Sequence, residues 1–481
     1  MRKALFLLTT ALCAVRLLCA QGPTSVWTLG DSIILAFDST SGPVVSGAHA
    51  MITQETYTTL ADEEGNLLAY SNGGGVWNAN HELMFNADSL AINAGPIVYG
   101  SSLSTGLAFF PIDGKENTYG YLVHDGAVDT IALRVSLRFS VLDMELDGGL
   151  GGFVDSLKSQ VVRTNLTEHL HVIRHANNKD WWLITKTNDS DSLRLNVDLL
   201  SGFDVTSSRT YAFEENLLGS RGVMSSSKDG CLLGMVTAGA SDTTSFIGLF
   251  RIDRETGLLT YLDHAEPRQD LHATCFSPSG RYLYIISDWP FKIWQYDLIS
   301  ESLDAFEPVF EPSWGNKARS LFIQRGDDDK LYFTMGRMPS ALETLDDYLG
   351  IIQYPDSPGV ACHVIPDHLF LQENPVSPGF LPVFPNYVRN PGVCEQGTTV
   401  SVSAPAAVET TGTVFKNTIG TQFAVVQQEG LIRVFDFAGR QRAQLTPQNA
   451  VFDLGHLPTG MYYAIQETEG KVRSQKLVIA H

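Results

Sequence analysis

Positive charge is scarce in this sequence. Its 481 residues include 33 Lys and Arg against 53 Asp and Glu, which gives a net charge of −20. Proteins bind DNA and RNA largely through Lys and Arg side chains that displace counterions from the phosphates. A chain this acidic is repelled by phosphate backbones, so the composition excludes nucleic acid as a partner.

Long apolar stretches and helical periodicity are also lacking. The apolar stretch from Ala4 to Val15 is shorter than the roughly 20 residues that a membrane-spanning helix needs, and no later segment is long enough, so we expect no transmembrane segment. Hydrophobic residues make up 44% of the chain, with 42 Gly, 25 Phe, 16 Tyr and 7 Trp. This composition favours turns and aromatic strands over helices, and predicts an all-β protein.

The first 20 residues have the layout of a secretory signal peptide. Two basic residues, Arg2 and Lys3, precede the apolar stretch, and small residues lie near Ala20. Removal of residues 1–20 would leave a mature chain with a net charge of −23, because three basic residues and no acidic ones are lost. A lipid anchor at Cys19 is the less favoured alternative, since the residues before it are poor for lipidation.

Cysteine is rare, and four of the six cysteines lie beyond the signal peptide: Cys231, Cys275, Cys362 and Cys394. None of them has the C-x-x-C spacing of a zinc site or a thioredoxin-type pair. Export to an oxidising compartment favours a disulfide, and we predict that Cys362 pairs with Cys394 and closes a Pro-rich loop. For Cys231 and Cys275, a buried unpaired thiol is an equally good interpretation.

A repeated unit organises residues 21–397. A polar turn followed by an aromatic or aliphatic strand begins at Gly65, Lys115, Lys179, Asp229, Ser279 and Asp328, at intervals of 50, 64, 50, 50 and 49 residues. A Gly-rich insertion that starts at Leu146 accounts for the long interval. The spacing matches a four-stranded propeller blade. Residues 21–397 are therefore predicted to form a seven-bladed (six to eight) β-propeller.

The composition changes beyond Cys394. Residues 398–411 are rich in Thr, Ser, Ala and Val, as in a linker. Residues 412–481 contain short strands separated by turn pairs such as Thr459-Gly460, which predicts a compact β-sandwich.

This C-terminal stretch resembles the C-terminal sorting domain of type IX secretion substrates in Bacteroidetes. The likeness rests on VFDFAGR from Val434, FDLGHLPTGMYYA from Phe452 and GKVRSQKLVI from Gly470, although the Asn-Pro pair that usually opens such domains is absent. The motif positions are Gly439, Leu457, Pro458, Gly460, Tyr462 and Lys476. The resemblance implies an immunoglobulin-like sandwich that engages the type IX machinery, and a protein that passes through the periplasm and is secreted or held at the outer-membrane cell surface.

The preceding region resembles exported Bacteroidetes propellers that are joined to such a sorting domain. The matching segments are residues 65–84, 139–154, 171–184, 276–285, 348–359 and 379–388. Propellers carry many unrelated activities, so the likeness predicts an architecture and no reaction.

The densest polar cluster in the sequence is Glu168, His169, His171, His175 and Asp180. On a strand, His169 and His171 share a face, and paired imidazoles near a carboxylate can bind a divalent metal or transfer protons. The favoured interpretation is structural, with His175 and Asp180 holding a turn between neighbouring strands.

A second candidate is a calcium loop. Asp143, Glu145 and Asp147 alternate and are followed by a glycine, but Val154 stands where such a loop has its last acidic ligand. A solvated turn is the favoured interpretation, calcium is the alternative, and no other cofactor is predicted.

The preferred function is a non-enzymatic binding platform whose blade loops and axial channel engage an extracellular protein or glycan. Five tryptophans could stack on sugars, although burial between blades is the favoured interpretation for most of them. They are Trp77, Trp181, Trp182, Trp289 and Trp294. The alternative is a metal-dependent propeller lyase or hydrolase that uses the His169 to Asp180 region.

Overall fold

The computed structural model describes residues 22–389, Cys394 and residues 414–479, with gaps. The gaps are residues 31, 39–41, 53–54, 92–102, 128–133, 190–191, 214–218, 239–244, 266–269, 290, 299–306, 313–317, 320–321, 335, 338–347, 372–380, 416–418, 425–429, 437–440, 447–450 and 469–470. The predicted signal peptide and linker lie outside the described residues.

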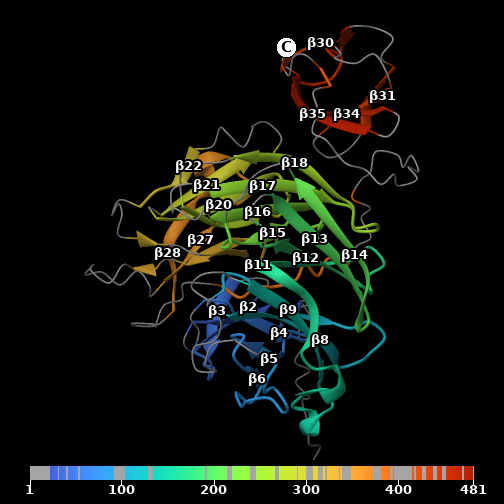
Figure 1. Cartoon of the computed structure of the whole chain (residues 1–481). Helices are drawn as coiled ribbons and strands as arrows, with labels where there is room; N and C mark the ends of the chain where they lie inside the picture. The colour runs from blue at the N-terminus through green and yellow to red at the C-terminus, as the bar shows by residue number, and fades with distance from the viewer. Residues whose placement is uncertain are drawn as a thin grey trace, which may run out of the picture.

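The chain is almost entirely β-structure (Figure 1). Its helical elements are short 3-10 turns, namely η1 (Asp147–Gly149), η2 (Asp155–Leu157) and η4 (Gly359–Cys362). The all-β prediction is confirmed. Within the described residues, no helix has the length and apolar character needed to cross a membrane.

Antiparallel sheets follow one another along residues 26–370, each built from strands that are neighbours in sequence. The first sheet contains β1 (Val26–Leu29), β2 (Ile33–Asp38) and β3 (Gly42–Gly47), and the second contains β4 (Thr58–Ala61), β5 (Leu67–Ser71) and β6 (Val76–Asn78). A larger sheet contains β7 (Leu107–Pro111), β8 (Thr118–Ala127), β9 (Arg134–Asp143), β10 (Gly152–Phe153), β11 (Gln160–Arg174), β12 (Trp181–Thr187), β13 (Leu193–Ser201) and β14 (Asp204–Phe213). It is continuous because β9 pairs with the first part of β11.

Three further sheets complete this part of the chain. One contains β15 (Met224–Ser226), β16 (Leu232–Ala238), β17 (Ser245–Ile252) and β18 (Leu259–Ala265). The next contains β19 (Asp270–Phe276), β20 (Tyr282–Trp289), β21 (Lys292–Asp297) and β22 (Glu307–Phe310). The last contains β24 (Ile323–Arg325), β25 (Leu331–Thr334), β27 (Tyr348–Ile352) and β28 (Val364–Phe370), while β23 (Ala318–Arg319) pairs separately with β26 (Gly336–Arg337).

The predicted repeat is confirmed by six turns, each of which joins two consecutive strands of one sheet. In each turn, the backbone N–H at the end of the first strand donates to the carbonyl at the start of the second. The pairs are Asp62–Asn66, Ile112–Thr118, His175–Asp180, Ser227–Leu232, Ser277–Tyr282 and Gly326–Lys330. Every start of the repeat falls inside one of these turns. Gly230 and Gly280 adopt φ values of 72° and 73°, a conformation that favours glycine.

The sheets are arranged as a ring. The strands that end at the six turns, which we call the inner strands, are β4, β7, β11, β15, β19 and β24. Neighbouring inner strands contact one another, with β4 against β7, β11 against β15, β15 against β19 and β19 against β24. The last sheet reaches the first, because Thr24 Oγ1 donates to Asp327 (2.9 Å) and the rings of Trp27 and Tyr332 are 5.9 Å apart. The fold is therefore propeller-like.

The chain itself occupies the middle of the ring. Residues 381–389, which we call the axial segment, form a parallel bridge with β11, and the Asn386 N–H donates to the Val172 carbonyl (2.8 Å). Near its start, the Val383 N–H donates to the Tyr57 carbonyl (2.9 Å), and the Tyr387 hydroxyl donates to the carbonyl of Phe109 (2.7 Å). The segment thus contacts sheets on different sides of the ring.

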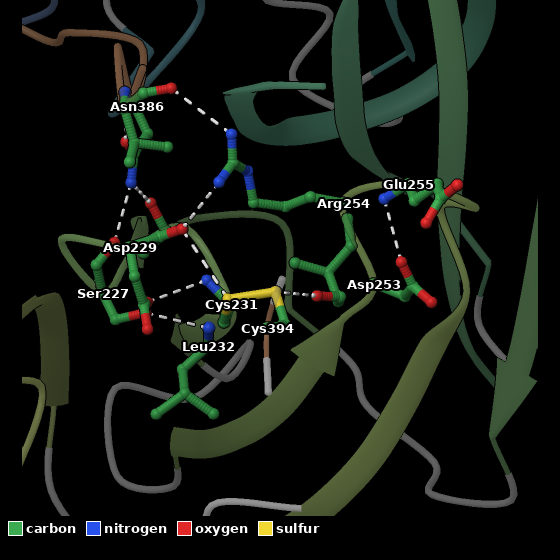
Figure 2. Close-up of a disulfide and its surroundings, with 12 residues drawn as sticks. Ser227, Asp229, Cys231, Leu232, Asp253, Arg254, Glu255, Asn386 and Cys394 are labelled. Carbon is green, nitrogen blue, oxygen red and sulfur yellow. Dashed lines mark hydrogen bonds between the residues drawn. A yellow bond between two sulfur atoms is a disulfide. The ribbon is translucent and has the colours of Figure 1, made fainter. Parts of the chain in front are cut away.

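A disulfide joins Cys231 to Cys394 (Figure 2), which corrects the predicted pairing of Cys362 with Cys394. Cys362 lies in η4 with a fully buried thiol. The axial segment, which follows β28, leads across the ring, and Cys394 lies at the turn before β16 beside Cys231. Cys394 is therefore not paired with Cys362, the cysteine nearest to it in sequence. Cys275 is a buried unpaired thiol, as one interpretation expected, whereas the same interpretation is wrong for Cys231.

Residues 414–479 have a hydrophobic core of their own, which includes Phe415, Phe423, Leu457 and Leu477. One sheet runs in the order β29 (Ile419–Gly420), β35 (Lys471–Ile479), β34 (Gly460–Thr468), β31 (Leu431–Asp436) and β32 (Gln441–Leu445). A second pairs β30 (Gln422–Ala424) with β33 (Val451–Asp453).

Candidate functional site

Buried polar side chains gather where several inner strands begin. The Glu168 carboxylate on β11 accepts hydrogen bonds from the Ser104 N–H (2.8 Å) and hydroxyl (2.7 Å), and the Ser104 hydroxyl also lies 3.3 Å from His272 Nε2 on β19. Burial raises the pKa of Glu168, while the Ser104 bonds and the charge of Arg221 act in the opposite direction. This Ser104–Glu168–His272 cluster joins the loop before β7 to β11 and β19 and is almost fully buried.

His169 and His171 lie on the same face of β11, as predicted, and both point to the neighbouring sheet. His169 Nδ1 accepts a hydrogen bond from Thr167 (2.9 Å) when Nε2 donates to the Val236 carbonyl (2.8 Å), and His171 Nε2 bonds to Ser226 Oγ (2.8 Å). Burial lowers the pKa of His169 to about 3 and that of His171 to about 4. Neutral imidazoles with these partners are cross-links between sheets, which supports the structural interpretation.

A glycine makes the His169 cross-link possible. Gly222 adopts φ 136°, and a Cβ at this position would lie 2.1 Å from the Val236 carbonyl oxygen and 3.2 Å from His169 Nε2. Only a residue without a side chain leaves room for the imidazole to reach that carbonyl.

His175 and Asp180 hold a turn, as the favoured interpretation expected. The backbone N–H of His175 donates to the Asp180 carbonyl (2.9 Å), and its Nδ1 accepts from the Asn177 N–H (2.9 Å). The Asn177 side chain donates in turn to the Asp180 carboxylate (2.7 Å), and the His175 ring lies 5.2 Å from that of Trp182. His175, Asn177 and Asp180 thus form one hydrogen-bonded network in the turn after β11, and the Trp182 ring packs against it.

Two further buried groups lie near His169. Both ring nitrogens of His124 on β8 are buried without a hydrogen bond of good geometry, and burial lowers the pKa of this residue to about 4. The Lys186 ammonium on β12 donates to the Gly219 carbonyl (2.8 Å), and burial lowers its pKa to about 8. Perturbed ionisable groups mark functional sites in some proteins and structural networks in others. Here each group lies between packed sheets, as a structural network requires.

The described residues contain no group of three or more His, Cys, Asp and Glu side chains that could hold a metal ion. The calcium candidates Asp143, Glu145 and Asp147 all belong to these described residues. Asp143 Oδ1 accepts the Glu145 N–H (2.9 Å), which closes a local turn, and Asp147 is exposed at the start of η1. The arrangement is the solvated turn that was the favoured interpretation.

Large apolar side chains are exposed at the end of the ring that carries the six turns, which we call the turn end. Contacts between turns, such as the ion pairs Lys179–Asp113 (3.8 Å) and Lys228–Asp329 (2.6 Å), show that the turns share this end. In an antiparallel four-stranded sheet, the connection between the third and fourth strands lies at the same end. Leu258 (49%), Tyr354 (53%) and Val360 (83%) are exposed on such connections, and Leu83 (54%) and Phe85 (57%) are exposed just after β6, the third strand of its sheet.

The tryptophans that could stack on sugars are buried. Trp77, Trp181, Trp182 and Trp294 are each less than a tenth exposed, as the favoured interpretation expected. The side chain of Trp289 lies outside the described residues.

Leu457, Pro458, Gly460 and Tyr462, four residues of the predicted sorting motif, lie around one turn of the C-terminal unit. Leu457 is buried in its core, and the Tyr462 hydroxyl donates to the Pro458 carbonyl (2.9 Å), four residues upstream. Gly460 begins β34, and Lys476 faces Tyr463 in the β34–β35 register. Gly439 lies outside the described residues. A tyrosine bonded back to the chain in this way fixes a corner of a β-sandwich.

The polar cluster itself combines residues that the sequence pattern singled out with others that it did not. Glu168 belongs to the cluster found in the sequence, but Ser104 and His272 lie far from it along the chain and in no recognisable motif. Their only local signal is a polar residue just before or at the start of a strand, which is common to many loops.

No protein-family model and no curated protein matches the chain. Among solved structures, a proposed 6-phosphogluconolactonase from Bacteroides uniformis is similar over 68% of this chain and 92% of its own, with 9% identity and a TM-score of 0.38. Prolyl oligopeptidase B from Galerina marginata matches over 93% of this chain and 56% of its own, with 10% identity and a TM-score of 0.37. Hsv2 from Kluyveromyces lactis matches over 65% and 86%, with 10% identity and a TM-score of 0.34. With scores this low, nothing about the activity of this chain follows from these likenesses.

Proposed function

We propose that this chain is an exported binding platform, a seven-bladed β-propeller whose loops at the turn end hold a protein partner outside the cytoplasm. Seven blades result when the large sheet is divided between β10 and β11, since each half then has its own inner strand and its own turn. The observation that carries the function is the set of exposed apolar side chains on the connections at the turn end.

Hydrogen bonds and ring stacking hold these exposed segments in place. The Phe85 backbone bonds to β10, because its carbonyl accepts the Phe153 N–H (3.1 Å), and the next residue, Asn86, donates to the Phe153 carbonyl (2.8 Å). Tyr354 stacks on His363 with ring centres 6.1 Å apart. Exposed aromatic and aliphatic groups on preorganised loops are typical of protein-binding surfaces.

A protein partner is favoured over a glycan or an axial ligand for two reasons. Sugar-binding sites commonly use tryptophan faces, and the described tryptophans are buried in the core. The axial segment contacts β7, β11 and Tyr57 just before β4, so it takes up space that an axial ligand would need.

Replacing exposed apolar residues at the turn end should abolish partner capture without unfolding the ring. The variant F85S/Y354S is compared with V161S, which removes an equally exposed side chain (54%) from β11, outside the loops of the turn end. Purified tagged protein is crosslinked to the surface fraction of the producing bacterium, and captured proteins are quantified by mass spectrometry. We expect at least a tenfold loss of one or more partners for F85S/Y354S and no change for V161S. Equal capture of partners by the wild-type protein, F85S/Y354S and V161S would reject the proposed binding platform.

Export by the type IX pathway is part of the proposal. It is supported by the likeness of residues 412–481 to sorting domains and by the turn that Leu457, Pro458 and Tyr462 build. Mass spectrometry of the native protein should find a mature start near Gln21 and a C-terminal part that is lost or conjugated at the cell surface. An intact C-terminus in the periplasm would contradict this route.

A further inference from the structure

Among the described strands, no sheet of the ring combines strands from both ends of residues 21–397. All strands of the first sheet come from residues 26–47, and all strands of the last come from residues 323–370. In the described residues, the seam between them consists of side-chain contacts, such as Thr24 with Asp327 and the Trp27 ring with that of Tyr332. No backbone ladder crosses this seam.

The axial segment passes along the seam and then away from it. At its start, Phe384 packs on Trp27 of β1 with ring centres 6.2 Å apart, and the Thr58 hydroxyl donates to the Val383 carbonyl (2.7 Å). At its end, the Asn386 side chain donates to Ser226 Oγ (2.8 Å) and to the Ser227 carbonyl (2.7 Å). Nine residues therefore connect the first sheet to the sheet of β15–β18 on another side of the ring.

The direction of the axial segment supports a role as the missing inner strand of the first sheet. The start of β1 contacts the turn before β25 through Thr24 and Asp327, so β1 runs opposite to the inner strands. The axial segment runs parallel to β11, as its bridge between Ile173 and Asn386 shows. It therefore lies beside β1 with the direction of the inner strand that the first sheet lacks.

The far end of the segment is locked. Figure 2 shows the Cys231–Cys394 disulfide beside Arg254, whose guanidinium donates to the Asp229 carbonyl (3.3 Å), and Asn386, which points to Ser227. Arg254 also donates to the Val388 carbonyl (3.3 Å). The disulfide spans 163 residues in sequence, and a cross-link over so long a loop stabilises the folded chain mainly by restricting the unfolded one.

We propose that residues 381–389, together with Cys394, form an axial latch, which closes the ring in place of a shared strand and is locked by oxidation after export. In the locking step, the Cys231 and Cys394 thiols lose two protons and two electrons and form one S–S bond. A disulfide-containing oxidant, such as glutathione disulfide or an oxidised dithiol protein, accepts both electrons and protons and becomes two thiols. This inference does not rest on the proposed partner.

Reduction of the Cys231–Cys394 disulfide should increase the mobility of the axial segment. It should also increase the mobility of the distant seam between the first and last sheets. The full chain is compared as the oxidised protein, as the same folded protein after treatment with a phosphine reductant, and as the variant C231A/C394A. We expect trypsin to cleave after Arg389, whose side chain is 60% exposed, at least tenfold faster in both unlocked forms. Hydrogen–deuterium exchange should also increase in β1 and at the start of β4, more than 150 residues from either cysteine in sequence.

Two controls distinguish an axial segment that holds the ring closed from a disulfide that stabilises only the residues near it, which we call a local staple. The variant C275A/C362A removes two buried thiols and leaves the disulfide, so it should keep the slow cleavage of the oxidised protein. N386A keeps the disulfide but loses the side-chain hydrogen bonds to Ser226, Ser227 and the Val388 N–H, and it should raise exchange in β1 to an intermediate level. If reduction increases exchange only around residues 228–232 and 381–394, the disulfide is a local staple and the latch is rejected. The reduced wild-type protein gives this answer even if the cysteine variant fails to fold.

Discussion

The free energy of unfolding should fall steeply between about pH 6 and pH 4. Four buried histidines have pKa values that burial lowers from 6.5, to about 4 for His49, His124 and His171 and to about 3 for His169. From about pH 6 down to about pH 5, each is neutral in the folded state and charged in the unfolded chain. Their contribution to stability is therefore fully present above pH 6.5 and is lost as the pH falls towards the folded pKa.

The size of the effect follows from proton linkage. Each histidine costs about 1.4 kcal/mol per pH unit once the unfolded imidazole is charged, so four cost about 5 kcal/mol per pH unit. Folded proteins have about 5–15 kcal/mol to lose, and unfolding is expected before pH 4. Glu168 acts with the opposite sign, because burial raises its pKa and the folded state gains from its protonation as the pH falls. One carboxyl offsets only part of the loss from four imidazoles.

Urea unfolding at several pH values tests this expectation. The slope of unfolding free energy against pH reports protons taken up on unfolding, and it should approach four protons near pH 5. His171→Gln should reduce the slope by about one proton, whatever its effect on stability at pH 7. A free energy that stays level from pH 7 to pH 4.5 would contradict the neutral imidazoles.

Replacing Arg254 should destabilise the ring by about 2–4 kcal/mol, the cost of leaving buried polar groups without partners. Its side chain is only 2% exposed, and it donates to the carbonyls of Arg174 (3.0 Å), Asp229 (3.3 Å) and Val388 (3.3 Å). These acceptors belong to β11, to the turn before β16 and to the axial segment. In Arg254→Met the side chain remains long and apolar, but three carbonyls lose a charged donor, and the bond to the Arg174 carbonyl is fully buried.

The matched control is Arg194→Met, because the Arg194 side chain is 47% exposed and pairs only with Asp189 and Ser192 in the described residues. An exposed ion pair contributes little, so its free energy of unfolding should stay within about 0.5 kcal/mol of wild type. Chemical denaturation at pH 7 gives both values. If R254M is as stable as R194M, then Arg254 does not hold the three elements together.

Local sequence patterns predicted the parts of this protein that depend on neighbours in the chain. A turn with a polar residue and Gly230 or Gly280 at a positive φ needs only a few adjacent residues, so its repetition revealed the sheets before any contact was known. The shared face of His169 and His171 followed from the alternation of side chains along a strand. The structural role of His175 and Asp180 was predictable for the same reason, since both belong to one turn.

Contacts between distant segments could not be predicted in this way. Cys362 is 32 residues before Cys394, and Cys231 is 163 residues before it. Spacing favoured the short loop, yet the axial segment carries Cys394 across the ring to Cys231. The path of residues 381–389 depends on hydrogen bonds to β11 and to residues beside β4 and β15, and none of these leaves a mark in the sequence of the segment.

By itself, the sequence determined that the protein is acidic, all-β and built from repeated sheets, because charge, composition and turn chemistry act locally. Only the tertiary structure decided that the middle of the ring is filled, which cysteines pair, and that Ser104, Glu168 and His272 meet. The physical reason is that each of these features joins separate sheets. Their distances depend on how whole sheets pack against one another, and that packing depends on the buried side chains of the entire ring.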